Sequence, residues 1–134
     1  RRRLENVRVL GADVHQVFES WIAPHSVYAI HVYFPDPWWK RKHRRRRVFT
    51  DRFADECARL LKPGGLLHSW TDVEEYFGVI SALMDHHPLF DKLAAPAETS
   101  PAHDLDYRTS FERRKRQAGL PIYRGRWQRR PLEN

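Results

Sequence analysis

One short segment combines a carboxylate, two indoles and a dense run of positive charge. Phe34-Pro35-Asp36-Pro37-Trp38-Trp39 leads directly into Lys40-Arg41-Lys42-His43-Arg44-Arg45-Arg46-Arg47. The chain has 24 Lys and Arg residues against 17 Asp and Glu, and the seven cations of this run account for the whole net charge of +7. Charge concentrated in this way favours an anionic partner. A bare Arg/Lys run is as often a solvated loop or a nuclear-import-like patch, but the adjacent acidic turn favours a site.

Three aspartates each follow a predicted strand. Asp13, Asp36 and Asp72 come just after the strand patterns at 7–10, 27–34 and 66–70. The carboxyl ends of parallel strands share one edge of a sheet, and ligands gather at that edge. A single aspartate in such a place is more often a helix cap or a turn former. Three at corresponding places favour a site to which separate strands deliver carboxylates.

The elements that must position these residues alternate between strand and helix patterns. Strands are predicted at 7–10, 27–34, 66–70, near residue 90, and as a final edge strand at 122–129. Helices are predicted at 14–22, 49–61, 71–84 and 109–118. Thr71 and Glu74 have the spacing of a capping box, and Lys62-Pro63-Gly64-Gly65 reads as a turn. The alternation predicts a single α/β domain over residues 1–134 with a largely parallel sheet.

Composition narrows the class of protein. Hydrophobic residues make up 41% of the chain, which is enough for a packed core, and the single Cys57 excludes an internal disulfide. No apolar run reaches the roughly 20 residues of a membrane span, and Arg1-Arg2-Arg3-Leu4-Glu5 contains no signal-peptide core. The eight histidines lack metal-ligand spacing. We expect a soluble, cytoplasmic protein without a metal, and its oligomeric state stays open.

Several blocks of the chain together resemble one known family, the tRNA (guanine-N7-)-methyltransferases, which are S-adenosylmethionine enzymes with a Rossmann-like fold. The matching blocks are Phe34-Pro35-Asp36-Pro37-Trp38 with the basic run, Leu61-Lys62-Pro63-Gly64-Gly65, Thr71-Asp72 with Glu74 and Tyr76, and Thr109-Ser110-Phe111-Glu112-Arg113 with Gly119. The proline-aspartate-proline-tryptophan turn before a basic run is specific to that family. The Lys-Pro-Gly-Gly turn occurs in many methyltransferases and adds little.

The chain departs from the family pattern in its glycines. The family has a Gly-rich turn after its first strand that holds the cofactor, but none of the six glycines here forms a GxGxxG-type loop. The resemblance therefore implies the C-terminal two-thirds of such an enzyme. The expected sheet is Rossmann-like, mostly parallel with an antiparallel edge, and lacks the first βαβ unit.

The resemblance also implies roles for individual residues. Asp13 would contact the adenosine end of the cofactor, and Asp36 would lie between cofactor and base, positioning them rather than abstracting a proton. The substrate would be bound by Lys40, Asp72, Thr109, Ser110, Phe111 and Glu112. The tRNA backbone would be bound by Lys42, His43, Arg44, Arg45, Arg46 and Arg47.

Two other functions remain open at this stage. The chain could be an RNA-binding homologue that keeps the tRNA-binding half without the chemistry, in which case it would not bind the cofactor. It could also be a different α/β enzyme whose basic segment binds another phosphorylated ligand, in which case it would not prefer tRNA over small phosphates.

Overall fold

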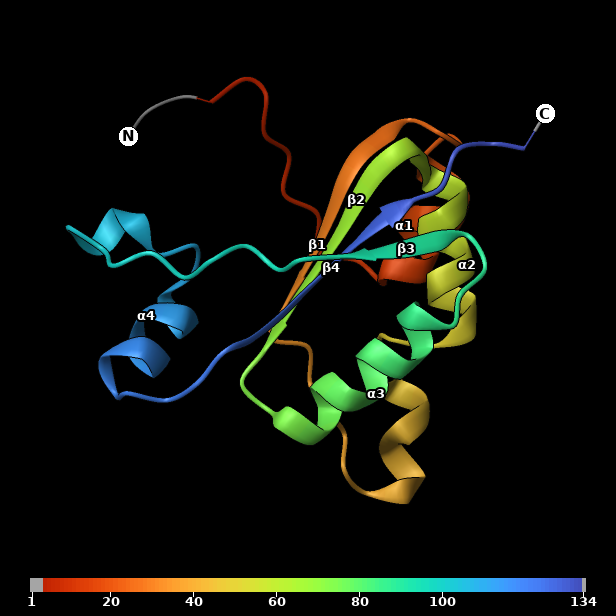
Figure 1. The fold of residues 1–134 in the computed structure, drawn as a ribbon. Helices are drawn as coiled ribbons and strands as arrows, with labels where there is room; N and C mark the ends of the chain where they lie inside the picture. Colours follow the sequence, from red (N-terminus) through yellow and green to blue (C-terminus); the bar gives the residue numbers. More distant parts are fainter. Residues whose placement is uncertain (1–3, 134) are drawn as a thin grey trace.

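The computed structural model describes residues 4–133 as an α/β fold (Figure 1). The expectation that the chain has no signal peptide rests partly on Arg1, Arg2 and Arg3, which lie outside this range. The helices are α1 (Val14–Trp21), α2 (Asp51–Leu60), α3 (Glu74–Asp85) and α4 (Ser110–Gln117), with short 3-10 helices η1 (Arg41–Arg46) and η2 (Asp104–Asp106). The strands are β1 (Val27–Tyr33), β2 (Leu61–Thr71), β3 (Phe90–Leu93) and β4 (Tyr123–Arg129).

The four strands form a mixed sheet in the order β1-β2-β4-β3. β1 and β2 are parallel, whereas β4 is antiparallel to both of its neighbours. The α/β class is confirmed, but the expectation of a mostly parallel sheet is wrong for residues 4–133. The final strand is also not an edge strand, because β4 lies between β2 and β3. Its alternating pattern arises because one face of β4 is buried, and a central antiparallel strand shows that alternation as readily as an edge strand.

Three local predictions need correction. Residues 7–10 form no strand, and Val9 is 92% exposed, because no neighbouring strand pairs with them in the described chain. Thr71 does not cap α3. It is the last residue of β2, its Oγ1 accepts a hydrogen bond from the Val73 amide at 3.2 Å, and Val73 occupies the cap position. The predicted turn at 62–65 is a bulge inside β2, where the pairing with β1 shifts between Val27 and Ala29.

The core lies between the sheet and helices α2 and α3, which cover one face of it (Figure 1). Its largest fully buried side chain is Trp127 of β4, whose Nε1 donates to Asp85 Oδ1 at 2.7 Å. A Cβ atom at Gly125 would lie 2.1 Å from the Trp127 ring, so only glycine fits beside that indole. Burial raises the pKa of the Cys57 thiol in the same core, which makes it an inert packing residue.

Within residues 4–133, no helix is both long enough and apolar enough to cross a lipid bilayer.

Candidate functional site

The carboxyl ends of the two parallel strands bring two of the three predicted aspartates to one edge. Tyr33 pairs with Trp70 in the β1–β2 register, and the Phe34 amide donates to the Trp70 carbonyl at 2.7 Å. Asp36 comes three residues after Tyr33, and Asp72 comes two residues after Trp70. Asp36 is followed in the chain by η1, and Asp72 is followed by α3 (Figure 1). The edge predicted from the parallel strand pattern is therefore present.

Helix α4 packs against the same edge, although it is remote in sequence. Lys115 Nζ lies 2.8 Å from Asp72 Oδ2, and the Phe111 ring centroid lies 4.5 Å from that of Phe34. The Thr109 hydroxyl begins the helix by accepting a hydrogen bond from the Glu112 amide at 3.0 Å. Part of the predicted substrate segment, 109–112, thus lies beside the strand ends, with Ser110 exposed on the first turn of α4.

The turn that carries Asp36 has an unusual backbone. Phe34 and Trp38, which flank the turn, have φ values of 52° and 45°, a region that costs a residue with a side chain about 1 kcal/mol or more. Asp36 Oδ1 accepts a hydrogen bond from the Trp38 amide at 3.0 Å, and the residue is exposed. Strain of this kind is typical of functional sites. The turn forms one side of a cavity of about 330 Å³ lined by Asp36, Trp38, Trp39, Lys40 and His43.

Asp13 has a different environment. Its Oδ1 accepts hydrogen bonds from the backbone amides of His15 and Gln16 at the start of α1, so it is a helix cap. The segment before it, residues 7–10, forms no strand, so Asp13 does not follow a strand as Asp36 and Asp72 do. Its role in cofactor binding stays a prediction.

The basic run folds as η1, with Lys40 at its cap position. Its cations at 40–42 and 44–46 are exposed, and among residues 4–133 none of them has an acidic partner. The His43 ring lies 5.7 Å from the Trp38 ring, and the Arg46 guanidinium lies 5.1 Å from it. Positive charge without internal partners is available to an external anion. Arg47 alone differs, as described below.

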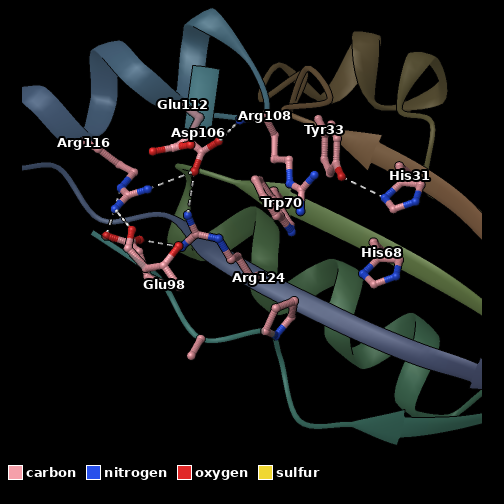
Figure 2. A pocket seen from close by; sticks show the side chains of 13 residues that line it. His31, Tyr33, His68, Trp70, Glu98, Asp106, Arg108, Glu112, Arg116 and Arg124 are labelled. Carbon is pink, nitrogen blue, oxygen red and sulfur yellow. Dashed lines mark hydrogen bonds and ion pairs between the residues drawn. The ribbon is translucent and has the colours of Figure 1, made fainter. Parts of the chain in front are cut away.

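A second cavity of about 240 Å³ lies over the open face of the sheet (Figure 2). Glu112 reaches it from α4 and is only 3% exposed. Its carboxylate accepts hydrogen bonds from the Arg108 amide at 2.7 Å, from Arg124 Nη2 at 3.2 Å and from Arg116 Nη1 at 3.4 Å. Glu98 lies on the other side of the same two guanidinium groups, 2.6 Å from Arg124 and 3.1 Å from Arg116.

Sequence reasoning did not find this network. Glu98 lies in an irregular segment, and Arg124 is one of several arginines in an alternating strand, so neither has a local signal. Trp70 also lines the cavity, and the Arg124 guanidinium lies 4.6 Å from its ring. A ligand that bound Glu112 through this cavity would have to displace hydrogen bonds that the carboxylate already accepts.

Two histidines, His31 and His68, line the same cavity on the side away from Glu98 (Figure 2). The rings of His31 and His68 stack at 4.6 Å with an angle of 4° between their planes, and the Tyr33 hydroxyl lies 2.8 Å from His31 Nδ1. Partial burial lowers the pKa of both imidazoles, and neighbouring arginine charge lowers it further. The pair therefore favours the neutral form.

The buried carboxylate of Glu112 makes a stability prediction. We expect Glu112→Gln to lower the free energy of unfolding by about 1.5–3 kcal/mol, because the substitution removes hydrogen bonds between charged groups from a buried position. Urea denaturation would measure the loss. The control is Glu75→Gln, the same substitution at an exposed position in the first turn of α3, which should cost less than about 1 kcal/mol. Equal effects of the two substitutions would contradict the structural role of the network.

Comparison with known proteins places these features in a family context. Residues 1–125 match the family model described as "Putative methyltransferase". A tRNA (guanine-N(7)-)-methyltransferase of Rhodopirellula baltica is 39% identical, with 92% of this chain and 48% of that protein covered. Another of the same name from Nitrosococcus oceani is 33% identical, with coverages of 94% and 52%. A solved S-adenosylmethionine-dependent O-methyltransferase from Thermotoga maritima is 13% identical with a TM-score of 0.46, over 88% of this chain and 38% of that one. The chain spans about half the length of the curated relatives that it matches.

Proposed function

The chain belongs to the methyltransferase family whose model it matches over residues 1–125, and from that premise we propose that the protein transfers a methyl group from S-adenosylmethionine to N7 of a guanine in tRNA. The observation that carries the proposal is the edge where the Asp36 turn, Asp72 and α4 meet beside the exposed cations of η1. Relatives named tRNA (guanine-N(7)-)-methyltransferase support the same reading. The cytoplasmic location expected from the sequence fits this activity.

We propose a division of labour for cofactor binding. S-adenosylmethionine supplies a methyl group activated by a sulfonium charge, and the exposed Asp36 carboxylate beside a cavity of about 330 Å³ fits a cationic group of that kind. Asp36 Oδ2 is left to position the reactants, because Oδ1 is already bonded to the Trp38 amide. Asp13 would contact the adenosine end. Since none of the six glycines forms a GxGxxG-type loop, the remaining contacts are expected from residues outside these 134.

The sheet itself supports the finer fold proposal. We propose that residues 1–134 form a single domain, part of a larger Rossmann-like sheet whose first βαβ unit lies outside them. In the described chain β1 pairs on one side only, with β2. Beside β1 is a groove of about 490 Å³, lined mainly by the apolar residues Val14, Phe18, Ile22, Val27, Ala29, Ile30, Val32, Val48, Phe53 and Leu60. An apolar groove at an open strand edge is what a sheet presents when it continues.

The main task of the protein in this reaction is to align guanine N7 with the methyl donor. Guanine N7 is an unprotonated acceptor on the major-groove edge, so its methylation needs no general base. Asp36 is therefore assigned to holding the reactants in line, and oriented proximity contributes on the order of 7–11 kcal/mol in favourable systems. Close contact of Asp36 with the sulfonium would stabilise the reactants more than the transition state, in which that charge is dispersed. The hydrogen bond from the Trp38 amide to Asp36 Oδ1 would hold the carboxylate in place.

The substrate side of the proposal rests on α4 and η1. Lys40, Asp72 and the segment Thr109–Glu112 would contact the target nucleotide, and the Glu112 carboxylate can accept from the Watson–Crick N–H groups of guanine once its internal partners yield. Extracting the base from its stack costs a few kcal/mol. Phosphate contacts from the exposed cations of η1 would offset this cost.

A sharp test uses a tRNA transcript in which 7-deazaguanosine replaces guanosine. The analogue keeps the Watson–Crick edge and lacks only the N7 acceptor. We expect radioactive methyl transfer to the unmodified transcript and none to the analogue, while both bind with similar affinity. Transfer to both transcripts would refute N7 as the acceptor.

A second candidate function is RNA binding without methyl transfer. It is suggested by the lack of a GxGxxG-type loop for the cofactor among these 134 residues. It predicts binding of both transcripts, no transfer to either, and no heat of binding with S-adenosylhomocysteine in calorimetry. A preference for small phosphates over tRNA would instead indicate a different α/β enzyme.

A further inference from the structure

Arg47 ends the basic run but does not share the environment of its neighbours. Arg44, Arg45 and Arg46 are exposed, whereas Arg47 is half-buried. Its Nε donates a hydrogen bond of 2.6 Å to the carbonyl of Pro37, ten residues earlier in the Asp36 turn. The side chain is therefore directed back into the protein, toward the segment that carries the aspartate.

The Arg47 guanidinium also lies between two aromatic rings. Its central carbon is 5.7 Å from the Trp39 ring in the turn and 5.2 Å from the Tyr76 ring in α3. Tyr76 is fully buried in the core. One planar cation thus connects the exposed turn with a fixed point of the hydrophobic core.

The turn needs an external restraint of this kind. Phe34 and Trp38 hold φ values of 52° and 45°, and a strained backbone persists only where its surroundings fix it. The internal hydrogen bond from the Trp38 amide to Asp36 fixes one part of the turn. In the described residues, Pro37 O and the Trp39 ring are the points at which Arg47 fixes the other part.

We propose that Arg47 is a positioning residue that holds the Asp36 turn in its reactive geometry, and that it does not bind the RNA backbone. This inference rests on the proposed function, and it differs from the prediction from sequence that Arg47 binds the RNA backbone together with its neighbours. Lysine could not replace it, because an ammonium group is a compact point charge without the planar face and the Nε–H that these contacts use.

Salt dependence separates the two roles without any activity measurement. A cation that neutralises a phosphate contributes about 0.7–0.9 to the slope of log affinity against log salt concentration. We expect Arg47→Gln to leave this slope unchanged, whereas the matched control Arg45→Gln should lower it by about 0.7–0.9. If Arg47→Gln lowers the slope as much as the control does, Arg47 is a phosphate ligand and the proposal is wrong.

Kinetics provide the second readout. Arg47→Lys should lower kcat for methyl transfer about tenfold or more while the KM for tRNA stays within about twofold, since misplacement of the reacting groups affects the transition state. The control Arg130→Lys, just after the end of β4 and outside η1, should change neither constant. A rise in KM alone for Arg47→Lys would overturn the positioning role.

A third measurement is informative even if the protein neither binds RNA nor transfers a methyl group. In nitrogen-15 spectra of the unsubstituted protein, the Nε–H of Arg47, assigned by its loss in Arg47→Lys, should exchange slowly with water, unlike those of Arg44 and Arg45. Fast exchange of the Arg47 Nε–H would contradict the proposal that Arg47 holds the Asp36 turn. Slow exchange without any RNA binding would refute the proposed function, but it would still support the role of Arg47 in holding the Asp36 turn.

Discussion

Replacing Arg44, Arg45 and Arg46 together with glutamate is expected to abolish RNA binding at physiological salt. The three side chains are exposed and have no acidic partner in the described residues, so their charge is available to phosphates. Losing three phosphate contacts should lower the slope of log affinity against log salt by about 2 to 3, and the new negative charges repel the backbone further. Filter binding or fluorescence anisotropy over a salt series would measure both effects.

The matched control reverses three cations elsewhere. Lys62 and Arg130 lie at the opposite end of β2 and β4 from the carboxyl edge, and Lys92 lies in the edge strand β3. Lys62→Glu, Lys92→Glu and Arg130→Glu change the net charge equally but should leave most of the salt slope intact. If both triple variants lose RNA binding to the same extent, net charge rather than η1 governs the affinity. If neither loses it, the basic run is not the RNA-binding surface.

The part of the site that was predictable from sequence is the part built from contiguous residues. The apolar and aromatic run at 27–34 predicts a strand, and β1 occupies 27–33, but the expectation that both of its faces are covered is wrong for the described residues, because β1 lies at the edge of the sheet and none of its residues is buried. The cap at Thr109 and the basic helix after it were likewise predictable, because capping needs only residues within one turn. Asp36 and Asp72 came to one edge because parallel strands separated by a helix leave little choice of geometry.

What was missed depends on partners that the sequence does not place. A strand pattern at 7–10 says nothing about whether another strand is available to pair with it, and in residues 4–133 none pairs there. The position of β4 inside the sheet depends on its pairing with both β2 and β3, which its own residues do not specify. The Glu98–Arg124–Glu112 network joins three segments through side chains, and basic residues are too frequent in this chain for any one arginine to stand out.

Arg47 shows the same limit within a single motif. In sequence it is one of four consecutive arginines, and electrostatics alone predicts the same role for all of them. The difference arises because Arg47 lies just past the end of η1, in extended backbone, where its side chain reaches the Pro37 carbonyl and the Tyr76 ring. A run of like charges can therefore contain both a binding surface and its structural support.

Asp36→Ala is expected to lower methyl transfer at least about a hundredfold while tRNA binding survives. The loss is of the size seen when one preorganised polar contact is removed from a transition state. Binding should persist because the cations of η1 remain, and the salt slope should not change. Single-turnover transfer of a radioactive methyl group, together with anisotropy on the same tRNA, would separate the two effects.

Asp36→Asn shows whether the carboxylate itself or only the shape of the turn is required. Asparagine keeps an oxygen that accepts the 3.0 Å hydrogen bond from the Trp38 amide, so the turn should stay folded, but its second group donates rather than accepts. We expect Asn to be nearly as inactive as Ala, because the free Oδ2 is the atom assigned to the reactants. Asp51→Asn, at the exposed start of α2, should keep full activity. An active Asp36→Asn protein would assign Asp36 to holding the turn and leave the contact with the reactants to another residue.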